Sequence, residues 1–81
     1  MENISIYDNG GKTLDRITVI YNDRKRMTKD GILYECISAS EIGSGFYLHS
    51  EAMKGKHLGK KIDFSKLSLP LQNKLLIELN N

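Results

Sequence analysis

The sequence predicts an α+β domain, a small antiparallel β-sheet of three to four strands with one C-terminal helix packed on it. Three observations predict this class. Residues 17–21, Ile-Thr-Val-Ile-Tyr, are all β-branched or aromatic. The preceding Asn9-Gly10-Gly11 tolerates the positive φ of a tight hairpin turn. Leucines at positions 71, 75 and 79 repeat every four residues, which is typical of a helix with one apolar stripe.

The first two predicted strands span residues 4–7 and 14–21, joined by a turn at 8–12. Because side chains alternate along a strand, the second strand has two faces. Ile17, Val19 and Tyr21 share one face, and Arg16, Thr18 and Ile20 share the other. The mixed second face indicates partial solvent access or a ligand surface.

The middle of the chain alternates between polar connections and short strands. Residues 22–31 are polar and basic with turn formers at each end, so they are predicted to be a long connecting loop. A third strand at 32–38 pairs with the second. Gly43-Ser44-Gly45 is a predicted hinge before a short fourth strand at 46–49, with Phe46 and Leu48 inward. Residues 51–61 are predicted to be irregular, with a short extended piece at 62–64.

The C-terminal helix has clear start signals. Ser68 is a good N-cap, because its hydroxyl accepts from an early helix N–H. Pro70 is tolerated in the first turn, where no intrahelical bond is lost. We expect the leucine stripe, with Leu76 beside it, to bury against one face of the sheet.

Length and composition restrict the class of protein. The chain of 81 residues is predicted to be one domain, residues 1–81, with a small core. Chains of this size often gain stability by assembly, so a homo-oligomer is expected. A single cysteine excludes an internal disulfide, and no Cys/His cluster has metal-ligand spacing. No membrane span, signal peptide or cofactor motif is found, so a cytoplasmic location is expected.

Three blocks of the sequence support a resemblance. They read YDNGGKTLDRITV at residues 7–19, GFYLH at 45–49, and GKHLGKKIDF at 55–64 followed by LSLP at 67–70. In these blocks the chain resembles a family of small proteins common in bacteriophages and other mobile genetic elements. Ile17 is a departure, because the family pattern usually has Tyr there. The resemblance implies a short sheet with a helix and a bacterial host cell.

The turn offers the first candidate site. Lys12 and Thr13 follow two glycines, but the glycine that opens a phosphate loop is missing and a strand follows, so a nucleotide-hydrolysing P-loop is excluded. The segment is either a plain hairpin turn or a nest of N–H groups that, with Lys12, holds an anion. Asp15 and Arg16 either form a surface ion pair or bind a ligand. In the second case Arg16 holds a phosphate and Asp15 accepts from a ribose or base.

The histidines and lysines of the second half give the remaining candidates. Tyr47 and His49 are positioned to stack on or hydrogen-bond a base. Lys56, His57 and Lys60 lie in a segment flanked by Gly55 and Gly59, which is either a solvated loop or a close approach to a phosphate. Cys36 is predicted to be a buried structural thiol rather than a nucleophile.

These residues lead to three hypotheses. The first is a binding protein, not an enzyme, that sequesters a small anionic nucleotide-like immune signal, as phage-encoded sponges do. Its predicted ligand-binding residues are Lys12, Thr13, Asp15, Arg16, Tyr47, His49, Lys56, His57 and Lys60. The second is an inhibitor of a host defence protein that acts through a patch around residues 24–26 or 46–47. The third is a weak nucleic-acid binder, against which the net charge of only +2 argues.

Overall fold

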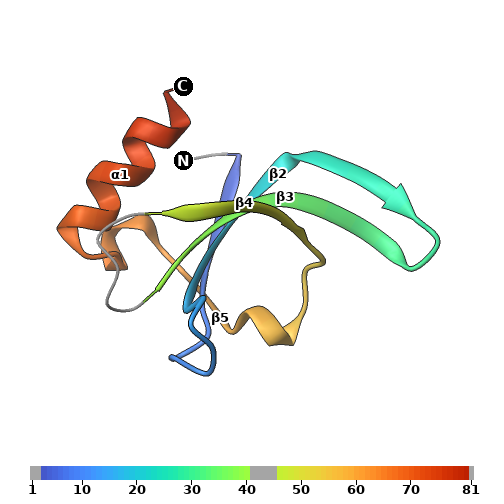
Figure 1. Cartoon of the computed structure of the whole chain (residues 1–81), viewed down its shortest axis with the longest axis horizontal. Helices are drawn as coiled ribbons and strands as arrows, with labels where there is room; N and C mark the ends of the chain where they lie inside the picture. The colour runs from blue at the N-terminus through green and yellow to red at the C-terminus, as the bar shows by residue number, and fades with distance from the viewer. Residues whose placement is uncertain (1–2, 41–45, 81) are drawn as a thin grey trace.

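A five-stranded antiparallel sheet and one C-terminal helix, α1, form the fold (Figure 1). The computed structural model describes residues 3–40 and 46–80, with the backbone alone at positions 47 and 48. The α+β class is therefore confirmed, with five strands in place of three to four. The strands are β1 (Ile4–Asp8), β2 (Ile17–Thr28), β3 (Gly31–Ala39), β4 (Tyr47–Ala52) and β5 (Lys60–Ile62). The predicted hinge at 43–45 lies outside the described residues.

The strand order is β4-β3-β2-β1-β5, so the chain crosses from one edge of the sheet to the other after β4. Residues 53–59 make this crossing and contain η1 (Lys56–Leu58), one turn of 3-10 helix. β5 then pairs with β1, where Ile6 faces Ile62 and Asp8 faces Lys60. The extended piece that was predicted at 62–64 therefore corresponds to β5, which begins two residues earlier and completes the sheet.

Alternation along the strands gives the sheet two different faces. The helix face, which includes Ile6, Val19 and Ile37, is apolar and packs against α1. The polar face presents the buried hydroxyls of Ser5, Thr18 and Ser38 around a small apolar cluster of Ile20, Cys36 and Leu58. Because Leu58 belongs to η1, the crossing connection covers part of the polar face.

The prediction of a connecting loop at residues 22–31 is wrong. β2 continues to Thr28, and its far half pairs with β3 from Lys25↔Tyr34 to Thr28↔Gly31. A bulge between Ile20 and Lys25 redirects the strand, and the far halves form a two-stranded β-ribbon (residues 23–34) that projects from the body (Figure 1). Both faces of this segment of β2 are exposed, so it lacks the alternation by which strands are found.

Short-range contacts explain why polar residues form this ribbon. The guanidinium of Arg24 lies 4.5 Å from the centre of the Tyr21 ring, and Arg26 makes a bidentate pair with Glu51 of β4 at 2.8 and 2.9 Å. The turn at residues 29 and 30 is closed by Thr28, whose hydroxyl donates to the carbonyl of Gly31 at 2.7 Å. These contacts stabilise pairing that propensity alone does not favour.

The helix α1 (Leu69–Leu79) follows the 3-10 turn η2 (Phe64–Lys66). Its start is confirmed, because the Ser68 hydroxyl accepts from the N–H of Leu71 and Pro70 lies in the first turn. Leu71 and Leu75 are buried in the core as expected. Leu76 and Leu79 are not, with 42% and 36% of their surface exposed, because only one narrow stripe of the helix meets the sheet.

Candidate functional site

One side chain organises the loop between β1 and β2. Asn9 is 9% exposed, and its amide nitrogen donates to the Thr13 hydroxyl at 2.9 Å and to the Asp15 carbonyl at 3.1 Å. Its amide oxygen accepts from the N–H groups of Gly11 and Lys12 at 2.9 and 3.1 Å. The loop is therefore an eight-residue structure built around Asn9, and β2 begins at Ile17, not at position 14 as predicted.

The backbone N–H groups that were predicted to form an anion-binding nest already donate to side chains of the loop itself. The N–H of Gly10 donates to the carboxylate of Asp8 at 2.8 Å, while those of Gly11 and Lys12 donate to Asn9. The loop's own side-chain oxygens thus occupy the place predicted for a ligand oxygen. Lys12 is an exposed residue at the tip.

Arg16 makes a contact that the sequence did not predict. Its guanidinium donates to both carboxylate oxygens of Asp8, from Nε at 2.8 Å and from Nη2 at 3.2 Å. These hydrogen bonds hold the pKa of Asp8 below its ordinary value. The pair borders a cavity of about 150 Å³ at the end of the helix face, which Ser68 and Leu71 also line.

A second cavity lies on the polar face, between the sheet and the crossing connection. Its volume is about 300 Å³, and three of the predicted site residues line it, namely Thr13, Asp15 and His57. The hydroxyls of Thr18, Ser38 and Ser50 come from three adjacent strands. Further lining residues are Asn9, Cys36, Glu51, Ala52 and Leu58. This cavity, called the hydroxyl cavity below, brings together three of the nine predicted residues.

The other predicted residues lie elsewhere or at its margin. Lys12 and Lys56 are the chain neighbours of Thr13 and His57, while Lys60 lies on β5 opposite Asp8. Arg16 lines the cavity at the helix face and His57 lines the hydroxyl cavity, so these two predicted site residues belong to different cavities. His49 is 74% exposed on β4. Tyr47 belongs to β4, but its side chain is outside the described part.

The structure adds residues that sequence reasoning missed. Thr18, Ser38 and Ser50 bring a hydroxyl each to the hydroxyl cavity, and Ser50 accepts or donates a hydrogen bond with the buried thiol of Cys36 at 3.3 Å. The alternation of side chains along β3 could have identified part of this lining, because Cys36 and Ser38 share the face of the strand opposite to Ile37. Strand order was needed to place Ser50 beside them.

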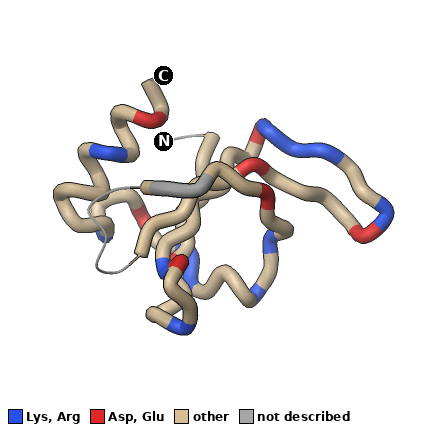
Figure 2. Tube along the Cα trace, in the orientation of Figure 1, with Lys and Arg blue, Asp and Glu red and all other residues tan. Residues whose placement is uncertain are grey.

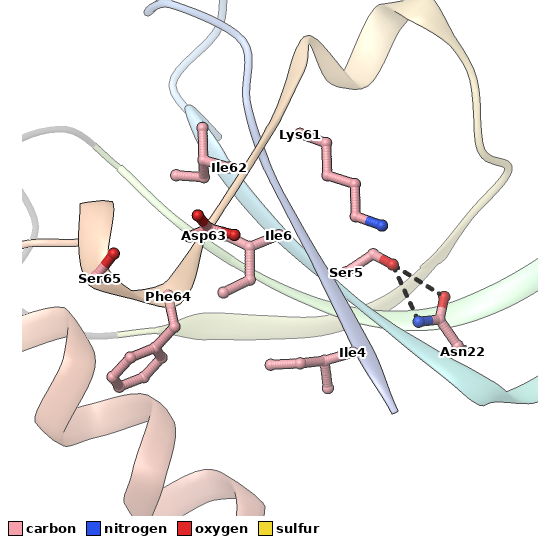
Figure 3. A pocket seen from close by; sticks show the side chains of 9 residues that line it. All are labelled: Ile4, Ser5, Ile6, Asn22, Lys61, Ile62, Asp63, Phe64 and Ser65. Carbon is pink, nitrogen blue, oxygen red and sulfur yellow. Dashed lines mark hydrogen bonds between the residues drawn. The ribbon is translucent and has the colours of Figure 1, made fainter. Parts of the chain in front are cut away.

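A larger, more open groove of about 620 Å³ runs along β1 beyond the end of β5 (Figure 3). Ser5 and Asn22 hydrogen-bond to each other there at 3.0 Å, and Lys61 extends toward them. On the opposite side the Phe64 ring points toward α1. None of the nine predicted residues lines this groove, so it does not support the predicted site.

Within residues 3–40 and 46–80, no group of three or more His, Cys, Asp or Glu side chains is arranged to hold a metal ion. No helix among the described residues is long and apolar enough to span a membrane.

Comparison of the chain with models of protein families, with curated proteins and with solved structures finds no match to any of them.

Proposed function

We propose that this protein binds a small nucleotide-like molecule in the hydroxyl cavity and withholds it from a host effector. The observation that supports this function is the meeting of Thr13 and Asp15 from one loop with His57 from another, over a floor of strand hydroxyls. Residues from segments this far apart in sequence form a ligand site more readily than a surface patch. The cavity of about 300 Å³ is at the lower end of small-molecule sites, which suits one nucleoside unit.

The chemistry of the lining matches a sugar and a base more closely than a bare phosphate. A carboxylate such as Asp15 accepts from ribose hydroxyls, and serine and threonine hydroxyls both donate and accept. His57 offers an imidazole for the edge or face of a base. The lysines next to Thr13 and His57 in the chain, Lys12 and Lys56, supply positive charge at the margin for a phosphate.

Binding without turnover is the simplest use of this site. The one thiol, Cys36, is 3% exposed and engaged with Ser50, so it is not presented as a nucleophile. A small protein that holds a signal nucleotide lowers its free concentration by mass action. The resemblance to proteins of phages and mobile elements supplies a setting, a bacterial cytoplasm in which such a signal triggers defence.

The β-ribbon supports a second candidate, inhibition of a host defence protein by surface contact. Figure 2 shows its basic positions in a run along β2. Met27 near its far end is 76% exposed, so the ribbon offers an apolar side chain beside its charges. Arg24 and Arg26 are paired with Glu35 and Glu51, which reduces the charge offered to nucleic acid and disfavours the third candidate.

Thermal-shift measurements with a panel of mononucleotides and cyclic dinucleotides test the first function, followed by calorimetry on any ligand that raises the melting temperature. We expect Asp15→Asn and His57→Ala each to weaken binding of that ligand about tenfold or more. Asp23→Asn changes the same residue type outside the cavity and leaves affinity unchanged.

Two results would count against the proposal. One is the absence of a stabilising ligand in the panel together with co-purification of a host protein that is lost in Lys25→Glu, which favours the second candidate. The other is a ligand whose affinity is unaffected by Asp15→Asn and His57→Ala.

A further inference from the structure

The strand β4 ends the sheet on one side with no neighbour among the described residues. An edge strand presents unpaired N–H and C=O groups along its outer side, and proteins usually protect such edges with proline, inward charges or very short strands. The opposite edge is protected by length, because β5 has three residues. β4 has six residues and no proline; its register shift against β3 lies between Tyr47 and Ser50, so residues 50–52 pair regularly. It is therefore the edge at which another strand can add.

The polar side chains of β4 favour a second copy of the same chain as that strand. Antiparallel pairing of two β4 strands about a two-fold axis at Ser50 places His49 of each copy opposite Glu51 of the other. Both side chains reach solvent, with 74% and 40% of the side chain exposed. The Glu51 carboxylate accepts from Arg26 of its own chain and has further acceptor sites, to which an imidazole N–H at the facing position can donate. Such polar cross-strand pairs stabilise an antiparallel pair. This register gives that contact twice.

The helix α1 strengthens the same choice of partner. The carboxylate of Glu78 lies 3.7 Å from Nε2 of His49, so the last turn of α1 lies over β4 on the helix face. Leu76, Ile77 and Leu79 in this part of the helix are 42%, 55% and 36% exposed. Two chains paired at β4 bring these apolar surfaces toward each other on one side of the joined sheet, where their burial adds to the backbone hydrogen bonds.

We propose that the protein forms a two-fold symmetric dimer by antiparallel pairing of β4, with the C-terminal turns of the two α1 helices brought together over the joint. The interface is isologous, as expected for a homodimer. It converts two five-stranded sheets into one continuous sheet and removes the open edge of each.

The dimer has a consequence for the hydroxyl cavity. Ser50, Glu51 and Ala52 line this cavity and also form the paired edge. The two cavities therefore lie side by side across the two-fold axis, on the face opposite to the helices.

Sedimentation velocity over a range of concentrations tests the dimer, with a matched pair of variants at one exposed position. His49→Glu faces Glu51 of the partner with like charge, and we expect the dissociation constant to rise roughly tenfold or more. His49→Lys places opposite charges at the facing positions and retains the dimer. Far-UV circular dichroism of both variants checks that each chain is folded.

A cross-link tests the register independently of affinity. In a Cys36→Ser background, which removes the native thiol, Ser50→Cys places two thiols face to face at the axis, and mild oxidation is expected to give a covalent dimer. Wild-type protein that remains a monomer up to about 100 µM overturns the proposal. So does a dimer that His49→Glu leaves intact and Ser50→Cys does not cross-link, because that dimer uses another surface.

Discussion

The two faces of the sheet are built from the same strands but do different things. On the helix face, Ile6, Val19 and Ile37 pack against Leu71 and Leu75 in a closed apolar layer. On the polar face, the alternate residues of those strands surround a much smaller cluster and a cavity lined with hydroxyls. Burial on the first face supplies most of the stability, which leaves the second face free to present polar groups to a ligand. Three changes test this division of roles.

The largest effect is expected from Leu75→Ala on the helix face. Leu75 is fully buried, so its truncation removes contacts and leaves a cavity, at a cost of about 2–5 kcal/mol in the free energy of unfolding. Leu58→Ala on the polar face is expected to cost less, about 1–2 kcal/mol, because its cluster is smaller. Urea denaturation followed by circular dichroism measures both.

Leu69→Ala is the control, since Leu69 is 72% exposed and its truncation is expected to change stability by no more than about 0.5 kcal/mol. Equal losses from Leu58→Ala and Leu75→Ala would contradict the division between the faces.

The next effect concerns the connection that covers the polar face. Gly59 has φ +89°, and a Cβ there would collide with the carbonyl of Asp8, so the connection depends on a glycine to lie against β1. Gly59→Ala is expected to lose at least about 2 kcal/mol of stability from the left-handed backbone and the collision together. Thermal or urea unfolding gives the value.

Gly10→Ala is the matched control, because Gly10 also has positive φ, +76°, but a Cβ there meets nothing within 4 Å. It is expected to show the backbone cost alone, about 1 kcal/mol. If both variants lose the same amount, the close approach of the connection to β1 contributes nothing.

The smallest effect is electrostatic and lies at the end of the helix face. The hydrogen bonds from Arg16 lower the pKa of Asp8 from its ordinary value near 3.8. The contribution of Asp8 is therefore present above that ordinary value and is lost as the pH falls through the lowered value in the folded protein. The free energy of unfolding of the wild type is expected to exceed that of Asp8→Asn by at most about 1 kcal/mol at neutral pH, because the Asp8–Arg16 pair is partly exposed.

Unfolding measured across the acid range checks this prediction, because the difference between the two proteins should shrink below pH 4. In an Arg16→Gln background the same substitution should have a smaller effect. A difference that is independent of pH would mean that Asp8 stabilises the chain by its shape and not by its charge.

The sequence predicted the parts of the fold that depend on local pattern. The core strand of residues 17–21, the third strand and the helix cap at Ser68 all follow from propensity and periodicity, and the structure confirms them. The β-ribbon was missed because its stability comes from pairing and from contacts such as Arg26 with Glu51, which are 25 positions apart. No local window contains that information.

The candidate site was predictable residue by residue but not as an arrangement. Thr13, Asp15 and His57 were selected from their chemistry, and the fold brings them to one cavity. Arg16 was selected for the same site, yet Asp8 draws it to the other face. Residue 16 precedes the first residue of β2, so strand alternation does not determine the direction of its side chain.

The buried amide of Asn9 also affects how the molecule ages. In an Asn-Gly pair the glycine nitrogen attacks the side-chain carbonyl carbon of the asparagine and expels ammonia, and water then opens the resulting succinimide ring to leave an acid. Here the Gly10 nitrogen is held by Asp8, and the Asn9 oxygen by two N–H groups, so the folded loop keeps the reacting atoms engaged. An unfolded chain has no such protection. A carboxylate at position 9 cannot donate to Thr13 or to the Asp15 carbonyl, so each molecule that deamidates loses two of the hydrogen bonds that hold the loop. Charge heterogeneity in a stored sample would thus record the time its molecules have spent unfolded.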